Sequence, residues 1–382
     1  MSPVGIPLCT AAAAALLFVA APASAQTELP SDWLLCSNEG TGYPPEIVAD
    51  GCSAVIGSAN RMPRELAVAY TNRGLAYRRL GKFARAFADY DAAIRLDPSY
   101  AFAFNNRGTA YNDTGDFDHA IADYNEAIKL APSSAVIITN RGAAWRDKGD
   151  LDRAIADYDE AIRIDPKYTS AYTNRGNAYR EKGDIDRAAA DYSAAIEADP
   201  TNAVAFNNRG AAYLVKRDFE HALVYFSEAI RLNPEYAMAF NNRGIAWRDK
   251  GDIDHAVADF GEAIRLNPRN GAAIVNRANA RRDQGDFDHA LADYSEAIKL
   301  NPKNTLALSS RGLARLRRGE LEGSMADFNA ALALNPRLAD ALYGRGIAKR
   351  KNGDSAGADA DFTAAKAINP AIAQALALFE IE

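Results

Sequence analysis

One tripeptide recurs along this chain every 34 residues, and that spacing constrains the fold more than any other feature. Asn-Arg-Gly begins at Asn72 and returns without a slip to Asn242, then continues in altered form as far as Gly344-Arg345-Gly346. A period of about 20–50 residues indicates a repeat protein, in which each unit packs against its neighbours. The period predicts nine units: 67–100, 101–134, 135–168, 169–202, 203–236, 237–270, 271–304, 305–338 and 339–372.

Each unit is predicted to form two helices. In the unit 101–134, apolar residues recur at helical steps over about Phe102–Thr114 and again over Phe117–Leu130. Between them, Gly115 offers a left-handed helix stop and Asp116 an N-cap for the second helix. A single hairpin of this kind cannot bury its apolar stripe alone, so the core must form by stacking.

The arrangement of aromatic and small residues within the unit identifies a resemblance. The pattern is aromatic-x3-Gly-x2-aromatic on the first helix, then Gly, then Ala-x3-aromatic-x2-Ala on the second helix, and a closing Pro. This pattern resembles the tetratricopeptide repeat family over 306 of the 382 residues. The resemblance implies an all-α, right-handed α-solenoid whose concave face, lined by the first helices, holds an extended peptide or a partner helix. In the second unit the pattern is carried by Phe104, Gly108, Tyr111, Gly115, Ala120, Tyr124, Ala127 and Pro132.

The distribution of charge argues against a nucleic-acid partner. The formal net charge is −6, but residues 67–372 carry 42 basic and 42 acidic residues and are therefore neutral. A nucleic-acid binder would show a basic face, because phosphate contacts dominate its affinity.

No residue pattern in the chain indicates catalysis. Gly-x-Ser-x-Gly, P-loop and His-Glu-x-x-His motifs do not occur, and carboxylates recur at repeated positions rather than as an isolated pair. We therefore predict a protein that is not an enzyme and needs no cofactor or metal. The four histidines share one register early in the second helix, where separate surface positions are expected rather than a metal site; they are His119, His221, His255 and His289.

A ladder of asparagines is the strongest candidate for a binding site. An amide offers both a donor and an acceptor, so a row of amides on the inner face could bind a peptide backbone without reading its sequence. The resemblance extends to the asparagine ladder of the repeat domain in O-linked N-acetylglucosamine transferases. The alternative is that each amide bonds a neighbouring helix and suits the seam between repeats. The ladder consists of Asn72, Asn106, Asn140, Asn174, Asn208, Asn242 and Asn276.

Apolar and charged residues are expected on either side of this ladder. Apolar pockets beside backbone-binding amides suit a peptide ligand, and arginines next to acids suggest a solvated edge. Thr71, Asn105 and Thr139 stand where the family's carboxylate clamp would begin, so a receptor for carboxylate tails is not expected. The apolar positions are Val68, Phe102, Val136, Val204, Met238 and Leu306, together with Leu75, Ala143, Ala211, Ile245 and Leu313.

The arginine of the tripeptide occurs in all nine units, with an acid 16 residues later in eight of them. We predict partly buried Arg–Asp pairs within a repeat or between nearest neighbours. In the fifth unit Tyr225 replaces the acid, so Arg209 must find another partner. The acids are Asp89, Asp123, Asp157, Asp191, Asp259, Asp293, Asp327 and Asp361.

The N-terminal residues are typical of an exported protein. An apolar run over Leu8–Ala21 precedes Ala23-Ser24-Ala25, a small-x-small cleavage pattern that predicts a signal peptide at 1–25, although a basic n-region is missing. We expect a periplasmic or secreted protein without a transmembrane segment. Residues 26–66 are predicted to form an N-terminal cap with a degenerate half-repeat.

Two cysteines remain after cleavage, Cys36 and Cys52. In an exported protein such a pair predicts a disulfide, and the alternative is two buried free thiols in a cytosolic protein. At the other end, residues 373–382 are predicted to form a capping helix. The leading prediction is a scaffold that binds an extended peptide or a partner helix in its concave groove. The alternative is a structural component of a cell-envelope complex that self-associates through its C-terminal end.

Overall fold

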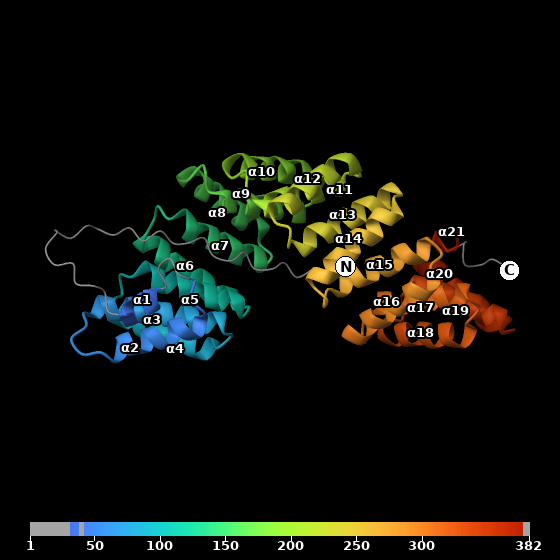
Figure 1. Cartoon of the computed structure of the whole chain (residues 1–382), viewed down its shortest axis with the longest axis horizontal. Coiled ribbons are helices and arrows are strands. Elements are labelled where there is room, and N and C mark those ends of the chain that lie inside the picture. Colours follow the sequence, from blue (N-terminus) through green and yellow to red (C-terminus); the bar gives the residue numbers. More distant parts are fainter. Residues whose placement is uncertain (1–30, 38–41, 377–382) are drawn as a thin grey trace. The chain divides into compact units, whose positions relative to one another are not determined.

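The structure is a computed structural model that describes residues 31–37 and 42–376, and all secondary structure in these ranges is α-helical (Figure 1). It divides into two compact units, one ending at Ala110 and the other beginning at Tyr111, which are treated separately below. The predicted signal peptide, 1–25, lies outside the described residues.

The first unit is a short helical array. Helix α1 packs on α2, α2 on α3, and α3 on α4. Helix α3 begins at Pro63, ahead of the first repeat, because Pro63 suits the first turn of a helix and Glu65 Oε2 accepts a hydrogen bond from Met62 N at 3.1 Å. The helices are α1 (Ser31–Ser37), α2 (Pro45–Gly57), α3 (Pro63–Arg79), α4 (Phe83–Leu96) and the start of α5 (Ala101–Asp113).

A disulfide joins Cys36 of α1 to Cys52 of α2, which confirms the predicted pairing. Both residues are fully buried, in a cluster that includes Val48 and Val55 and against which Trp33 packs. The bond thus fixes α1 to α2 and closes the apolar end of α3.

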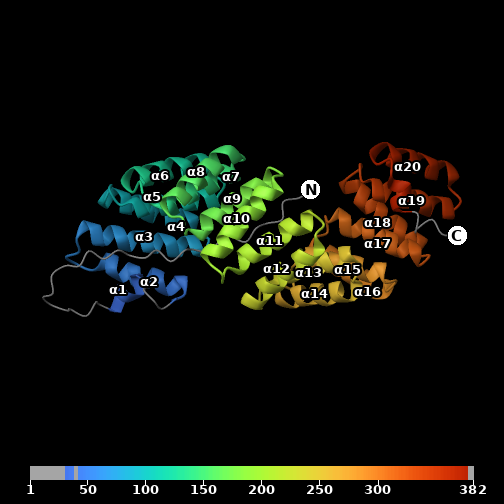
Figure 2. The same cartoon turned by 90° about the horizontal axis from the view of Figure 1, so that it is seen from above.

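The second unit repeats one hairpin. Each first helix packs on the second helix of its own repeat, and from α6 to α19 each second helix packs on the next first helix, as Figure 2 shows for α11 to α16. This consecutive pairing confirms the predicted all-α solenoid of helix–turn–helix units. The helices are α6 (Phe117–Leu130), α7 (Ala135–Asp147), α8 (Leu151–Ile164), α9 (Thr169–Glu181), α10 (Ile185–Ala198), α11 (Ala203–Val215), α12 (Phe219–Leu232), α13 (Ala237–Lys250), α14 (Ile253–Leu266), α15 (Gly271–Asp283), α16 (Phe287–Leu300), α17 (Thr305–Arg317), α18 (Leu321–Leu334), α19 (Ala339–Lys351), α20 (Ser355–Ile368) and α21 (Ile372–Ala375).

The turn within most hairpins follows the predicted chemistry, although Lys82 and Glu320 precede α4 and α18 without a side-chain cap. Gly149 has φ +94°, a left-handed conformation that costs glycine little, and Asp150 then accepts the backbone N–H of Arg153. The fifth repeat departs from this pattern, since Arg217 takes φ +60° at the glycine position. A residue with a β-carbon is strained in this region, so the hairpin turn of the fifth repeat is less stable than the others.

The core of a repeat depends on a glycine and an aromatic ring. A β-carbon added at Gly176 would lie 2.7 Å from Cε1 of Tyr192, so the ring occupies the space that the glycine leaves. Ala188 and Ala195, on either side of that ring along α10, are also fully buried. The missing side chain of the glycine therefore lets the two helices approach closely, and the tyrosine ring fills the space that is left between them.

The described C-terminal end is short. Helix α21 (Ile372–Ala375) includes only residues 373–375 of the expected capping segment 373–382, and Ile372 and Leu376 are buried in the cluster around Phe362. Residues 377–382 of that prediction lie outside the described part of the chain. Among the described residues, no helix is long and apolar enough to cross a membrane.

Candidate functional site

The seven ladder asparagines occupy one register position on successive first helices, α3 to α15, and each is half-buried. Asn72 and Asn106 belong to the first unit and the other five to the second unit. A half-buried amide is held in place by its neighbours yet still meets solvent.

In the fifth to seventh repeats, each ladder amide reaches back to the preceding repeat. Asn242 Nδ2 donates to Oδ1 of Asn207 at 3.0 Å, and Asn276 Nδ2 donates to Oδ1 of Asn241 at 3.0 Å. Asn208 Nδ2 donates to Asn177 at 3.3 Å, one turn further along its helix. These contacts match the predicted alternative in which the amides support the seam between repeats.

Contacts between adjacent asparagines join these bonds into one chain. Asn207 donates to Asn208 at 3.2 Å and Asn241 donates to Asn242 at 3.4 Å, so hydrogen bonds run in one direction from Asn276 to Asn177. An amide has two N–H donors and an oxygen with two lone pairs. Asn208 and Asn242 each use one donor and one lone pair here, so each retains one of both for a ligand.

The ladder residues outside this chain are arranged differently. Asn106 Nδ2 donates to the carbonyl of Phe102 on its own helix at 2.8 Å. Asn72 and Asn174 make no side-chain hydrogen bond to the described residues. The ladder position is asparagine in every one of these cases and does not distinguish them. The partners Asn207 and Asn241 stand one residue earlier in their repeats, where the second repeat also carries Asn105 and the first, third and fourth carry threonine.

Apolar side chains lie at the second position of several first helices, as predicted. Val136, Val204 and Leu306 are 40%, 37% and 53% exposed. Leu313 was also expected on this surface, but it is buried at 4% because α19 packs against α17 and covers it. The apolar surface therefore does not extend to that position of the eighth repeat.

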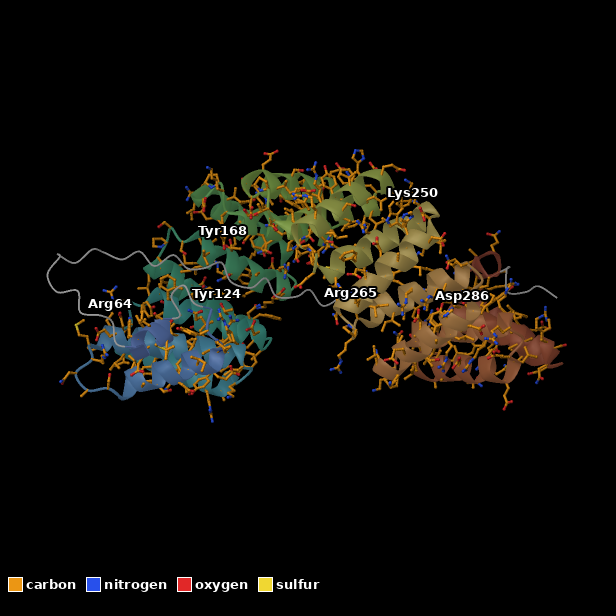
Figure 3. The ribbon with its side chains drawn as sticks, viewed as in Figure 1. Arg64, Tyr124, Tyr168, Lys250, Arg265 and Asp286 are labelled. Atoms are coloured by element: carbon orange, nitrogen blue, oxygen red, sulfur yellow. A yellow bond between two sulfur atoms is a disulfide. The ribbon has the colours of Figure 1, made fainter. Side chains whose placement is uncertain are left out.

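Adjacent ion pairs line the C-terminal ends of the first helices. Arg146 contacts Asp147 at 2.9 Å, and Arg248 contacts Asp249 at 2.8 Å. The fifth repeat breaks this row, since Val215 takes the place of the acid and is 60% exposed. Figure 3 draws the side chains of the repeats and labels two polar ones from second helices, Arg265 of α14 and Asp286 at the start of α16.

The predicted Arg–Asp pairs form wherever both residues lie in the same one of the two compact parts of the structure, 31–110 or 111–376. Arginine Nε and Nη2 each donate to one carboxylate oxygen at 2.6–2.9 Å, which is the bidentate geometry that favours arginine. The pairs are Arg73–Asp89, Arg141–Asp157, Arg175–Asp191, Arg243–Asp259, Arg277–Asp293, Arg311–Asp327 and Arg345–Asp361.

A second contact of these arginines links consecutive second helices. Arg141 Nη1 donates to Asn125 Oδ1 at 2.7 Å, and Arg175 Nη1 donates to Asp159 at 2.5 Å, in both cases 16 residues earlier. Sequence reasoning missed this bond, although a polar residue stands 16 positions before most of these arginines. One guanidinium therefore holds two repeats together.

The pKa values of the last pair follow from these bonds. The hydrogen bonds that Arg345 donates to Asp361 raise the pKa of Arg345, against the opposing effect of burial. Burial acts to raise the pKa of Asp361, but the hydrogen bonds from Arg345 and Lys349 outweigh it and lower that pKa. Both groups are therefore charged at neutral pH.

The fifth repeat lacks this pair. The guanidinium of Arg209 instead lies over the ring of Tyr225, 4.4 Å from its centroid. The Tyr225 ring in turn stacks on Tyr213 at 5.4 Å.

The histidines occupy separate surface positions, as predicted. The Nδ1 atom of His221 pairs with the carboxylate of the N-cap residue Asp218 at 2.8 Å, and its ring stacks on Tyr213. His255 repeats the arrangement with Asp252 and Trp247.

The family models that match this chain all describe one kind of repeat. Models described as TPR repeat match residues 142–180 and 176–215, and models described as tetratricopeptide repeat match residues 71–135, 203–236, 237–270 and 275–339. No curated protein matches the sequence significantly.

Two solved structures are similar in fold. One is the APC/C hetero-tetramer Cut9–Hcn1, with a TM-score of 0.56 and 16% identity, covering 79% of this chain and 59% of that chain. This chain therefore spans less than two thirds of that relative. The other is a tetratricopeptide repeat protein from Parabacteroides merdae, with a TM-score of 0.50 and 20% identity, covering 69% of this chain and 98% of that chain.

Proposed function

Because the chain belongs to the tetratricopeptide repeat family, we propose that it is a protein–protein interaction scaffold whose first helices bind an extended polypeptide. The observation that carries the proposal is the row of half-buried amides on successive first helices of the second unit. Peptide backbones offer one donor and one acceptor per residue, which is the chemistry that each amide complements.

The hydrogen-bonded chain of asparagines joins neighbouring repeats and also orders the amides that we propose bind the peptide. Because Asn208 and Asn242 are held by neighbouring amides, their remaining donor and acceptor are fixed in direction before a ligand arrives. A group that is already ordered loses less conformational freedom on binding. The seam and the binding surface are thus two uses of the same residues.

The exposed apolar residues supply the second part of the proposed site. Val136 and Val204 lie on the same first helices as Asn140 and Asn208. Main-chain hydrogen bonds contribute affinity, while apolar contacts contribute preference for particular side chains. We expect a ligand with apolar side chains spaced along an extended backbone.

A non-catalytic role is part of the proposal. The carboxylates of the second helices are held by arginines, as Asp157 is by Arg141, or by helix N-termini, as Asp150 is by the N–H of Arg153. Groups held in this way stabilise the fold, which supports a scaffold rather than an enzyme.

Export remains a proposal based on residues 1–25. The buried Cys36–Cys52 disulfide supports it, since such bonds persist in oxidising compartments. If the full chain is produced in a bacterium, the exported protein should begin at Gln26 on N-terminal sequencing. An unprocessed N-terminus in the cytoplasm would contradict export.

The described C-terminal end offers less support for self-association. Ile372 and Leu376 are buried inside the last repeats, so they close the array rather than present an apolar face. Light scattering on the chain with and without residues 371–382 separates the two functions. An oligomer that depends on these residues would favour the envelope component.

The proposed binding is tested with a peptide selected from a random display library against the wild-type chain. The triple variant Asn140→Ala, Asn174→Ala, Asn208→Ala should bind the peptide about tenfold more weakly or worse, since each lost hydrogen bond contributes about 0.5–1.5 kcal/mol. The control is Glu160→Ala with Arg163→Ala, an exposed pair on α8 whose removal leaves the net charge unchanged. Equal binding by the triple variant and the control would exclude the ladder.

A further inference from the structure

Arg209 differs from the equivalent arginines of the second unit in its surroundings. In the sixth repeat, Arg243 binds Asp259 through Nε and Nη2 and Ser227 through Nη1. Arg209 makes no hydrogen bond or ion pair with the described residues, and its Nε is buried without a partner. A buried donor without an acceptor costs stability, so the fifth repeat retains an unfavourable group that the other repeats satisfy.

The residues that would satisfy Arg209 are present or nearby but do not bind it. Tyr225 stands at the aspartate position and offers its ring face rather than a carboxylate. Ser193 stands where Ser295 accepts a bond from Arg311, yet Ser193 bonds only the carbonyl of Ala189. The Arg209 guanidinium therefore remains positive and without a counter-charge in the described structure.

The surroundings of Arg209 combine this charge with exposed apolar surface. Tyr225 lies between Tyr213 and Phe206, with ring centroids 5.4 and 6.3 Å away. Val224, which precedes Tyr225 on α12, is 64% exposed, where other repeats carry alanine. The site lies apart from the asparagine ladder, because Arg209 points to α12 whereas Asn208 points back to Asn177.

We propose that Arg209 and Tyr225 form a second binding site, which accepts a carboxylate side chain flanked by apolar residues from an acidic segment of a partner protein. The Arg209 Cζ lies 4.4 Å from the ring centroid, and Nε is the guanidinium nitrogen that is buried, which leaves the Nη groups for an anion. Stacking and bidentate carboxylate binding are compatible in arginine, because the fork lies in the plane that stacks. The partner's carboxylate would supply at the Nη groups the counter-charge that an aspartate supplies in the other repeats.

A carboxylate fits better than a phosphate. In seven repeats the equivalent arginine binds a planar carboxylate with two parallel hydrogen bonds. The exposed Val224 of the same helix offers a contact to apolar neighbours of such a residue rather than to a hydrated phosphate.

The test uses labelled, end-capped peptides that carry Leu-Glu-Leu in a Gly/Ser background, with Leu-Gln-Leu and Leu-phosphoserine-Leu as matched probes. We expect the glutamate peptide to bind the full chain at least about tenfold more tightly than the glutamine peptide. Arg209→Ala and Tyr225→Asp should each remove this preference. Arg217→Ala, which removes an exposed arginine of the same repeat, should preserve it, as should the triple ladder variant.

Tyr225→Asp supplies a second measurement that does not depend on the peptide. It restores the repeat's own carboxylate, so its unfolding temperature should exceed that of Tyr225→Asn. Equal binding of the glutamate and glutamine peptides by the wild-type chain would overturn the proposal and leave a structural Arg–Tyr stack only. Preference for the phosphoserine peptide alone would overturn the assignment of a carboxylate.

Discussion

Asn242 donates a hydrogen bond from its side chain to Oδ1 of Asn207, 35 residues earlier, at 3.0 Å. Asn207 is almost fully buried, whereas Asn242 is half-buried and still meets solvent. The bond therefore connects the interior of one repeat to the proposed binding surface of the next. On the other side of the same first helix, Arg243 connects to Asp259 and Ser227, so two separate polar rows join consecutive repeats.

Asn207→Ala should destabilise the fifth and sixth repeats. The change removes the acceptor of Asn242 and the donor to Asn208, and leaving buried polar groups unsatisfied costs about 1–3 kcal/mol. Asn207→Thr should cost less, because Thr173 at the same register bonds the Thr169 carbonyl of its own helix. Urea unfolding measures both variants. A loss for Thr as large as that for Ala would contradict the role assigned to the helix bond.

Two glycine-to-alanine substitutions should have opposite effects. Gly176→Ala places a methyl 2.7 Å from Tyr192 and should cost about 1–3 kcal/mol, since overpacking forces neighbours to move. The seventh repeat tolerates Ala278 at this register, so the fold should persist. Gly261→Ala, on α14 with its nearest atom 3.9 Å away on Arg277, should stabilise by about 1 kcal/mol. Thermal unfolding with the same sign for both would contradict this explanation.

Asp259→Ala should be among the most destabilising single changes. The carboxylate is buried and Arg243 is partly buried, so its removal leaves an unpaired guanidinium, at a cost of about 3 kcal/mol. The control is Glu126→Ala, which removes an exposed pair with Lys129 and should cost less than about 1 kcal/mol. Denaturant unfolding compares the two. Similar losses would mean that the arginine pairs contribute no more than ordinary surface pairs.

Two buried tyrosines should respond differently to phenylalanine. The hydroxyl of Tyr158 is buried with no hydrogen-bond partner, whereas Tyr192 donates to Asn177 at 2.8 Å. Tyr158→Phe should therefore stabilise the protein, and Tyr192→Phe should cost about 1 kcal/mol. Phe226 and Phe260 fill the same register in other repeats, so both rings should pack without strain.

Alkaline pH provides an independent check on the tyrosines. Burial raises the pKa of Tyr192 to about 12, above the value near 10 expected in the unfolded chain. Folding then favours the neutral hydroxyl, so this stability is present below about pH 10 and is lost as pH rises towards 12. The free energy of unfolding of Tyr192→Phe should fall less steeply with pH than that of the wild type between pH 10 and 12. An unchanged pH dependence would show that Tyr192 does not control alkaline unfolding.

Helix bounds within a repeat could be predicted from the sequence, because capping residues and the ends of the apolar stripe mark them locally. The predicted second helix Phe117–Leu130 has the observed bounds, since Asp116 caps it and the apolar stripe ends at Leu130. Helix α3 begins before Ala67, the first residue of the first repeat, because Pro63 and Glu65 extend it towards the N-terminus. Local chemistry determines helix ends, and periodicity alone does not.

The contacts between repeats were harder to predict. The pairing of Arg175 with Asp191 follows from a constant spacing, but its bond to Asp159 depends on which side chain the neighbouring helix brings within reach. The burial of Leu313 depends on how closely α19 approaches α17. Such distances arise from packing and cannot be derived from register.

Site-specific photocrosslinking tests the proposed binding surface most directly. A benzophenone amino acid replaces Val204 on the first helix of the fifth repeat or, as a control, the exposed Ala258 on the second helix of the sixth repeat. Each variant is irradiated with the peptide selected against the wild-type chain. We predict crosslinking from position 204 and none above background from position 258. Capture from position 258 alone, or equal capture from both, would contradict a ligand bound along the first helices.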